Sequence, residues 1–432
     1  MAENSLPSPG DMVIHDYRPQ EKPLVNESLK CLIHQESEAI IKTIQDLDPD
    51  VIILQEVDIF CQRSGNRDHM QELCKSLELL GGFVCEFEEI DSPVRKLRDA
   101  VSRNVYAKIQ DTNSSIQGGG VHGNAILSKH DIDFRVLEHR KDAFDWAKDG
   151  GKFKEPRKGK RYTLVGTVNA SPLPPIICYS VHLEVFTGII NRIHNFSDIL
   201  EDAASIAEKY PHQIIGGDLN TMAHSIVRLS PKYACDRYRW MSLGDTESNW
   251  FDRHVMAVYR DPQHEYNLRL AAAGFPFSMA PIRFIRFTWR LLGSLKLFEL
   301  VSGFDLETLK RARNPGFYDP WDPDEITLHN PDYFGLFKAK LDWTMVRCMD
   351  VRQKWIGNRN YSESDHAYLM VKVTPDSKEK LDNAHEIWNH RRRQWQPNKS
   401  APYWRSTIGV SVLILVLTLV THWLLYLLGP FM

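Results

Sequence analysis

Several apolar runs along the chain end at, or carry, a polar residue of a kind that enzymes use. The clearest run is Gln213–Ile215, which leads into Gly216-Gly217-Asp218-Leu219-Asn220. A short apolar run bounded by turn residues predicts a buried strand. Because side chains alternate along a strand, Asp218 and Asn220 would lie on one side of its end. A carboxylate beside an amide suits attack on phosphate, although Gly-Asp also marks ordinary turns.

Four further runs repeat this pattern. They are Val51–Leu54 before Gln55 and Glu56, Ile176–Val181 before His182, Leu341–Val346 around Asp342, and Ala367–Val371 after Asp365 and His366. A Glu at the end of a core strand is costly unless it is paired or binds a metal, and Mg²⁺ prefers such oxygen ligands. Taken singly, Glu56 equally fits a strand tip in water, and His182 fits a satisfied core histidine.

Apolar residues at helical spacing predict three helices. These cover Ser28–Leu47, Arg67–Leu80 and Asn191–Tyr210. Gln117–Gly120 predicts a flexible turn, and Lys141–Lys160 predicts a charged surface loop. Pro315–Pro331 is rich in Pro and Asp, which predicts a rim loop over the site.

Together the strand motifs resemble the endonuclease/exonuclease/phosphatase superfamily, the fold of DNase I and exonuclease III-type enzymes. The residues match, and so does their order: Gln55-Glu56, the His182 strand, Gly217–Asn220, the Asp342 strand and Ser364–His366. Gly123–Lys129 also resembles a strand of that family. The resemblance covers about residues 12–374. It implies an α+β fold, the DNase I-like four-layer sandwich in which two packed β-sheets are flanked by helices.

The resemblance also implies a metal and a water. Glu56 would be the principal ligand of Mg²⁺, with Mn²⁺ as an alternative, and Asp365 would be a second metal contact. Asp218 would activate or orient the attacking water. Asn220 would steady that water or the phosphate.

Further residues would face the phosphate. His366 would bind it and stabilise the developing charge, and Asp342 would orient His366. His182 would either stabilise charge or protonate the leaving oxygen. Asn124 would line the pocket as a substrate-binding residue.

One family motif is missing. The family opens with an apolar strand that ends in Asn, whereas this chain opens with Met12–Tyr17 and carries no Asn there. Either His15 or Asp16 replaces that residue, or the motif is lost, which bears on catalytic competence. Asn26 precedes a predicted helix and fits a helix cap instead.

The composition narrows the class of protein. The net charge of −3 argues against a protein that coats nucleic acid, since such domains are usually basic. The seven cysteines are scattered without a Cys-x-x-Cys pair, which is typical of a reduced, cytosol-facing protein.

The C-terminal segment has the properties of a membrane anchor. Ile408–Leu428 is almost wholly apolar and carries no formal charge. As a helix it would span about 30 Å, the thickness of a bilayer core. Arg391–Arg393 lie before it, as expected on the cytosolic side. We therefore expect a single-pass anchor in the endoplasmic reticulum or another intracellular membrane, with the catalytic domain in the cytosol; a buried core helix is the alternative.

The expected organisation follows from these segments. It comprises a flexible N-terminus (1–11), a catalytic domain (12–374) with an insert at about 235–337, a basic polar linker (375–407) and a transmembrane helix (408–428). Within the insert, residues 275–298 fit a basic amphipathic helix that lies on a membrane, or an ordinary packed helix.

Three functions remain open. The first is a membrane-anchored, Mg²⁺-dependent phosphoric ester hydrolase acting on a phospholipid headgroup, sphingomyelin-like or phosphoinositide-like. The second is a tethered nuclease or RNA exonuclease, with Trp240, Trp250 and Trp321 available for base stacking. The third is a catalytically impaired membrane scaffold. The Trp-Cys-Asp-Arg motif of inositol polyphosphate 5-phosphatases is absent, since Lys340–Trp343 stands in its place. The sequence points to no protein partner.

Overall fold

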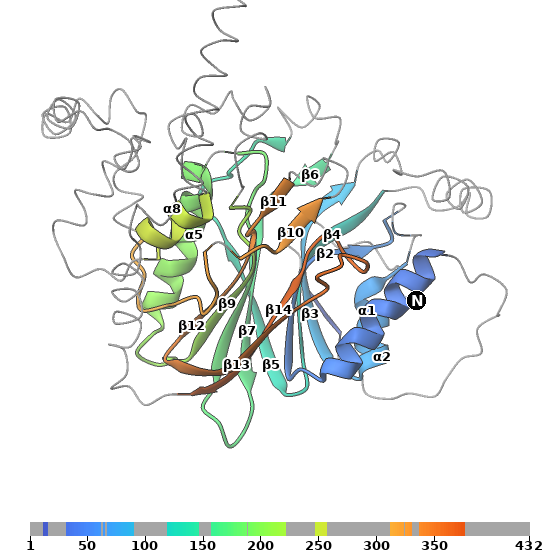
Figure 1. Ribbon diagram of the computed structural model, residues 1–432, viewed down its shortest axis with the longest axis horizontal. Coiled ribbons are helices and arrows are strands. Elements are labelled where there is room, and N and C mark those ends of the chain that lie inside the picture. The colour runs from blue at the N-terminus through green and yellow to red at the C-terminus, as the bar shows by residue number, and fades with distance from the viewer. Residues whose placement is uncertain are drawn as a thin grey trace, which may run out of the picture.

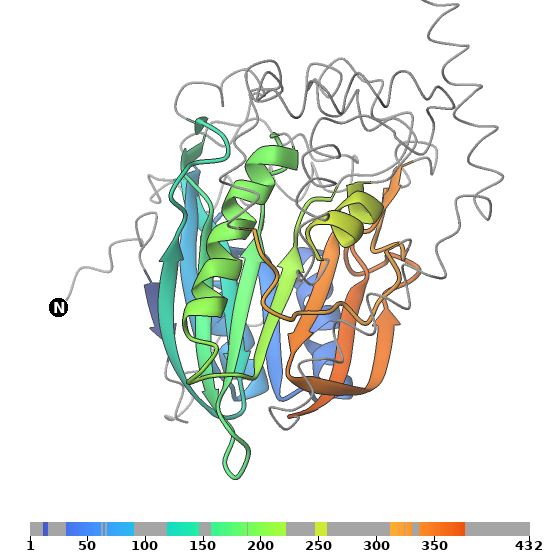
Figure 2. The same cartoon turned by 90° about the vertical axis from the view of Figure 1, so that its left-hand side faces the viewer.

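Two β-sheets pack face to face at the centre of the molecule, and helices cover their outer faces (Figure 1). The computed structural model describes residues 12–15, 32–61, 64, 67–89, 119–146, 157–187, 189–221, 247–256, 312–323, 325–330 and 337–375. Figure 2, a quarter turn away, shows α5 lying along the outer face of one sheet. This arrangement confirms the predicted two-sheet sandwich with flanking helices.

The first sheet has five strands in the order β1-β3-β4-β2, with β6 also paired to β3. Its strands are β1 (Met12–His15), β2 (Val51–Ile59), β3 (Leu80–Glu89), β4 (Gly119–Ser128) and β6 (Arg157–Gly159). All of these pairings are antiparallel.

The second sheet has five strands in the order β12-β9-β8-β7-β5, and only β8 and β9 run parallel. Its strands are β5 (Asp131–Glu138), β7 (Tyr162–Asn169), β8 (Ile176–His182), β9 (Gln213–Asp218) and β12 (Asp342–Arg347). Two small sheets complete the fold. They pair β10 (Leu328–Asn330) with β11 (Phe337–Ala339), and β13 (Met349–Gly357) with β14 (Tyr368–Pro375).

Three apolar layers hold the sandwich together. One lies between the sheets and includes Val84, Ile126 and Leu164. The others lie outside the sheets, beneath the helices. The helices are α1 (Leu32–Leu47) and α2 (His69–Leu77) on the first sheet, and α5 (Ile189–Ser205) and α8 (Glu247–His254) on the second (Figure 1). The five described free cysteines are all buried.

Several local predictions are corrected by the structure. Gly119 and Gly120 belong to strand β4 and not to a flexible turn. Trp146, expected in a surface loop, is buried and donates a hydrogen bond to Glu184. The segment expected as a rim loop is partly core, because Phe317 is fully buried there and β10 begins at Leu328.

Strand β1 does not restore the missing family Asn. It pairs with β3 at the edge of the first sheet, with Met12 opposite Val84 and His15 opposite Gly81. The strand therefore runs away from the Glu86 end of β3, where the other sequence motifs gather. His15 stands opposite Gly81, and Asp16 lies outside the described residues, so the replacement of the Asn by either residue stays a prediction.

Other predictions fall outside the described residues. These are the N-terminal segment 1–11, the helix at 275–298, nearly all of the linker 375–407 and the apolar segment 408–428. In the part of the chain that is described, no helix is long and apolar enough to cross a membrane.

Candidate active site

Three neighbouring strands of the second sheet present a row of polar side chains. The parallel pairing of β8 with β9 places His182 opposite Asp218. The antiparallel pairing of β9 with β12 places Asp342 opposite Asp218 on the other side. Asp218 is therefore the middle residue of a His–Asp–Asp row, which the register of the strands fixes.

The first sheet contributes two glutamates from β-bulges on either side of β4. Gln55 and Glu56 of β2 together stand opposite Asn124, and Glu86 of β3 is an extra residue between the partners of Gly123 and His122. A bulge bends its strand and re-aims a side chain. Gly123 allows the backbones of β3 and β4 to approach closely at this bulge, because a Cβ at residue 123 would lie 1.9 Å from the carbonyl oxygen of Val84.

The two bulged glutamates end in opposite environments. Glu56 has a positive φ of 55° and is exposed. Glu86 is fully buried, and it accepts hydrogen bonds from Asn124 Nδ2 at 3.0 Å and from Arg161 Nη1 at 2.8 Å. The Glu56 side chain is thus exposed where a ligand can reach it, whereas Glu86 anchors the interior of the site.

His366 is held by Asp342. Its Nδ1 lies 2.8 Å from Oδ2 of Asp342. Burial alone would lower the pKa of His366, but the charge and hydrogen bond of Asp342 and the charge of Asp218 outweigh it and raise that pKa to about 10. Asp342 therefore favours the imidazolium form of His366, which is one of the two effects that the family resemblance left open for this pair.

Asp218 is a nearly buried carboxylate with a raised pKa. Burial and the adjacent Asp342 carboxylate raise it, while His366 and a hydrogen bond from the backbone N–H of Asn220 oppose the rise. That backbone bond, to Oδ1, is 2.7 Å long. The other oxygen, Oδ2, lies 3.7 Å from Nε2 of His182. A carboxylate with a raised pKa is a better proton acceptor near neutral pH than an ordinary aspartate.

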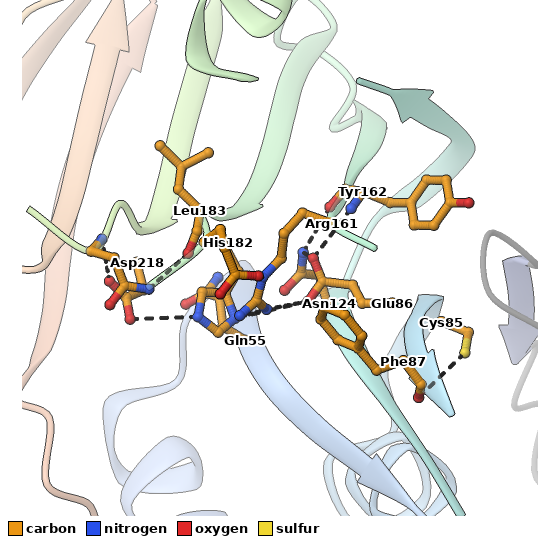
Figure 3. Close-up of polar contacts among 12 residues, drawn as sticks. Gln55, Cys85, Glu86, Phe87, Asn124, Arg161, Tyr162, His182, Leu183 and Asp218 are labelled. Atoms are coloured by element: carbon orange, nitrogen blue, oxygen red, sulfur yellow. Dashed lines mark hydrogen bonds and ion pairs between the residues drawn. The ribbon is translucent and has the colours of Figure 1, made fainter. Parts of the chain in front are cut away.

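A buried charge network lies behind His182 (Figure 3). Nη1 of Arg161 contacts Nδ1 of His182 and Oε2 of Glu86, both at 2.8 Å. Nε of Arg161 donates to Oε2 of Glu184 at 3.3 Å, and Trp146 donates to the same oxygen at 3.0 Å. These ion pairs raise the pKa of Arg161 against the opposing effect of burial. The network gives His182 a fixed cationic neighbour.

Gln55 joins the two sheets beside the site. Its Nε2 donates to Oγ of Ser180 on β8 at 3.2 Å, and Ser180 in turn donates to the carbonyl oxygen of Leu54 at 3.1 Å. Gly217, with a φ of 140°, leaves room for this bridge, since a Cβ there would lie 2.9 Å from the Gln55 amide nitrogen. In the Gln55-Glu56 pair, the amide of Gln55 therefore has a structural contact, and the carboxylate of Glu56 is exposed.

The carboxylates fit a divalent cation bound through few protein ligands. Among the described residues, no group of three or more His, Cys, Asp or Glu side chains is placed to hold a metal. Mg²⁺ commonly takes one or two carboxylates and completes its shell with water and substrate oxygens. Glu56 suits this role, because it is exposed and its charge contributes to the raised pKa of Asp218. The role of the exposed Asp365 as a second metal contact stays a prediction.

Two predicted site residues have other contacts. Asn124 is fully buried, and its Nδ2 donates to Glu86 and to the carbonyl oxygen of Tyr162. Its Nδ2 therefore supports Glu86, and the substrate-binding role of Asn124 stays a prediction. The amide of Asn220 donates to the carbonyl oxygen of Leu183 at 2.7 Å, so at least its nitrogen is used structurally.

Three residues of the site went unassigned in the sequence. They are Glu86, Arg161 and Glu184, all buried. Glu86 interrupts an apolar strand just as Glu56 does, and Glu184 follows His182 by two residues. Both signals were present in the sequence. Arg161 adjoins a charged segment and carries no comparable signal.

A comparison with family models found a match to this chain. The model described as the endonuclease/exonuclease/phosphatase family matches residues 34–366. The chain belongs to this family. As an endonuclease/exonuclease/phosphatase family member it is an enzyme of the metal-dependent phosphoric ester hydrolase class.

Solved structures of low similarity accompany this match, whereas no curated protein matches the chain. One is an endonuclease/exonuclease/phosphatase from Beutenbergia cavernae, 14% identical over 80% of this chain and 70% of that chain, with a TM-score of 0.41. Another is the human Nocturnin catalytic domain with bound sulfate, 13% identical over 79% and 86%, with a TM-score of 0.37. A third is ANGEL2, a 2′,3′-cyclic phosphatase, 14% identical over 78% and 84%, with a TM-score of 0.38. At such identities these structures carry nothing about the substrate of this chain.

Proposed function

We propose that the chain is a membrane-anchored, Mg²⁺-dependent hydrolase of a phospholipid headgroup ester, sphingomyelin-like or phosphoinositide-like. The observation that supports hydrolysis is the position of Asp218, which pairs in register with His182 on one side and Asp342 on the other. A carboxylate thus lies between a histidine and a His–Asp pair, which supports its proposed role as the base. In-line attack of water on a phosphorus needs groups of these kinds.

Asp218 would accept the proton of the attacking water. The raised pKa of its carboxyl suits this task, and the backbone N–H of Asn220 fixes one of its oxygens. The oxygen of the water forms the new bond to phosphorus as the bond to the leaving oxygen breaks, and the leaving oxygen departs as an anion that takes its proton from solvent. Mn²⁺ or Mg²⁺ bound at Glu56 would supply Lewis-acid stabilisation of the phosphate charge.

His366 would stabilise the charge on the phosphate. Its imidazolium is maintained by Asp342, and its side chain is 28% exposed, so it can reach a substrate. Preorganised cationic donors of this kind are commonly the largest single contribution to catalysis. The costly buried charges around the site favour a working enzyme over an inactive scaffold.

The proposal of a lipid substrate rests on the apolar segment 408–428. A C-terminal anchor would hold the catalytic domain near a bilayer surface, where phospholipid headgroups are the most abundant phosphate esters. The nuclease alternative loses one of its stacking candidates, because Trp321 is buried with Lys354 over its ring. Trp240 and the Trp250 side chain lie outside the described residues.

A substrate panel tests this proposal. The full-length protein in detergent micelles would be assayed with sphingomyelin, phosphoinositides, single-stranded RNA and abasic duplex DNA, first with Mg²⁺ and then with EDTA. We expect metal-dependent turnover of one lipid class. Turnover of nucleic acid alone would make the chain a tethered nuclease, and no turnover of any substrate would favour the scaffold.

A further inference from the structure

Arg161 occupies a position from which it can set the chemical state of His182. Both residues are nearly buried, at 5% and 4% exposure. One nitrogen of the guanidinium, Nη1, is 2.8 Å from Nδ1 of His182 and 2.8 Å from Oε2 of Glu86. Nη1 has two hydrogens, so each of these acceptors can receive its own.

The contact with Arg161 decides which nitrogen of His182 carries the proton. A guanidinium has only donors and does not lose its proton in proteins. Nδ1 of His182 must therefore present its lone pair. The carboxylate of Glu86 does not compete for a proton on Nδ1, because its Oε2 lies 3.8 Å away, beyond hydrogen-bond distance. The ring hydrogen is then on Nε2, which faces Asp218 Oδ2 at 3.7 Å.

His366 is in the opposite situation. Its Nδ1 lies 2.8 Å from a carboxylate oxygen of Asp342, which can only accept. Nδ1 of His366 therefore carries a hydrogen. The two histidines of the site thus have different partners at the same ring atom, a cation for His182 and an anion for His366.

We propose that Arg161 is a positioning residue that fixes His182 as the neutral Nε2–H tautomer. His182 then donates a hydrogen bond to a phosphate oxygen and keeps its proton throughout the reaction. It does not protonate the leaving oxygen, which was one of the two roles that the sequence left open. This inference rests on the proposed phosphate-ester hydrolysis.

The surroundings of Arg161 keep it in place. Glu184 accepts from its Nε and Glu86 from its Nη1, while the ring of Phe87 lies 4.9 Å from the guanidinium carbon. Glu184 is itself held by Trp146. The planar guanidinium can donate to Glu184, Glu86 and His182 at the same time. The single ammonium group of a lysine does not provide donors in this arrangement.

The direct test is the protonation pattern of His182 in the full-length protein. Nitrogen NMR of ¹⁵N-histidine-labelled enzyme, with His182 assigned by its loss in H182N, distinguishes a nitrogen that bears hydrogen from one that does not. We expect Nε2 to bear hydrogen and Nδ1 to be bare. A hydrogen on Nδ1 would overturn the proposal. This readout needs no turnover, so it stands even if the proposed substrate is wrong.

A second arm tests the role of Arg161 itself. R161K keeps the buried positive charge, and R347K is its control, because Arg347 is equally buried and bonds the carbonyl oxygens of Pro211 and Pro315. In R161K we expect a mixture of His182 tautomers and a kcat about 10²-fold lower, with KM less affected. R347K should retain the wild-type values. A wild-type tautomer pattern in folded R161K would contradict the proposal.

Discussion

The carboxylates of the candidate site differ in their surroundings. Glu56 is exposed, Asp218 is nearly buried, and Asp342 is hydrogen-bonded to His366. Carboxylates gathered in this way repel one another, which is why Asp342 and Glu56 both raise the pKa of Asp218. The excess of negative charge is relieved by His366 and, in the proposed mechanism, by a divalent cation.

Replacement of Glu56 tests the metal at the level of one residue. For Glu56→Gln we expect activity to fall by orders of magnitude and the Mg²⁺ requirement to shift to higher concentration. The fold should survive, because the side chain is exposed. Initial rates across a Mg²⁺ titration measure the effect, and E38Q on the outer helix α1 is the control. Normal turnover by E56Q would refute the metal role of Glu56.

The pH profile tests the Asp342–His366 pair. The pKa of His366 is about 10, so the imidazolium persists below that pH and its contribution is lost as pH rises through 10. Because Asp342 is the main cause of the rise, D342N should lower this pKa and move the alkaline limb of kcat/KM to lower pH. D131N, at an exposed position on β5, is the control. An unmoved alkaline limb in D342N would show that His366 does not govern it.

The same proton affects stability. The pKa of His366 is raised from an ordinary value of 6.5, so the folded protein holds the proton more tightly than the unfolded chain does. The stabilisation is complete below about pH 6.5 and is lost as pH rises through about 10. D342N should therefore lose more stability at pH 6 than at pH 10 in urea unfolding.

Strand register and bulges bring these residues together at the level of elements. Neighbouring positions on β8, β9 and β12 place His182, Asp218 and Asp342 in one row. Bulges in β2 and β3 turn Glu56 and Glu86 out of the regular ladder. His182, Asp218 and Asp342 thus lie on paired strands, which suits the precise positioning of a phosphate, whereas His366 precedes β14.

Helix α8 is an element whose packing can be tested. Phe251 of α8 is 1% exposed, and its ring centroid lies 5.1 Å from that of Phe196 and 5.3 Å from that of Trp343. Phe251→Ala should lower the free energy of unfolding by about 3–5 kcal/mol, because it leaves a cavity between α5 and β12. Urea denaturation measures this loss.

Phe60 provides the matched control for Phe251. It is 37% exposed at the end of β2. Phe60→Ala should change the free energy of unfolding by no more than about 0.5 kcal/mol. Equal losses in the two variants would mean that α8 is not packed as described.

The sequence was a good guide to strands and a poorer guide to what supports the site. The Asp218 and His182 strands and three helices follow from local patterns, whereas the Asp342–His366 pair was expected from the family resemblance. The support of the site arises from contacts between distant segments, such as Arg161 with Glu86. No local period encodes a bulge, so the burial of Asn124 and the exposure of Glu56 became visible only in the folded sheet.

At the scale of the whole molecule, the sandwich and the C-terminal segment have separable roles in this account. The described domain carries the site on two sheets and their helices (Figures 1 and 2). Deletion of residues 408–432 should therefore release the protein from membranes while leaving hydrolysis of a soluble phosphate ester unchanged. Sedimentation of a cell lysate measures the first effect. Continued sedimentation of the deleted protein with membranes would locate the anchor elsewhere.

The central claim is that Asp218 is the base that accepts the proton of the attacking water in metal-dependent hydrolysis of a phosphate ester. The most direct measurement compares wild-type protein with D218N on the best substrate of the panel, each with Mg²⁺ and with EDTA. We predict turnover by the wild type with Mg²⁺ only, and a loss of several orders of magnitude in D218N although the variant remains folded. Turnover that persists in EDTA, or that D218N retains, would contradict the account.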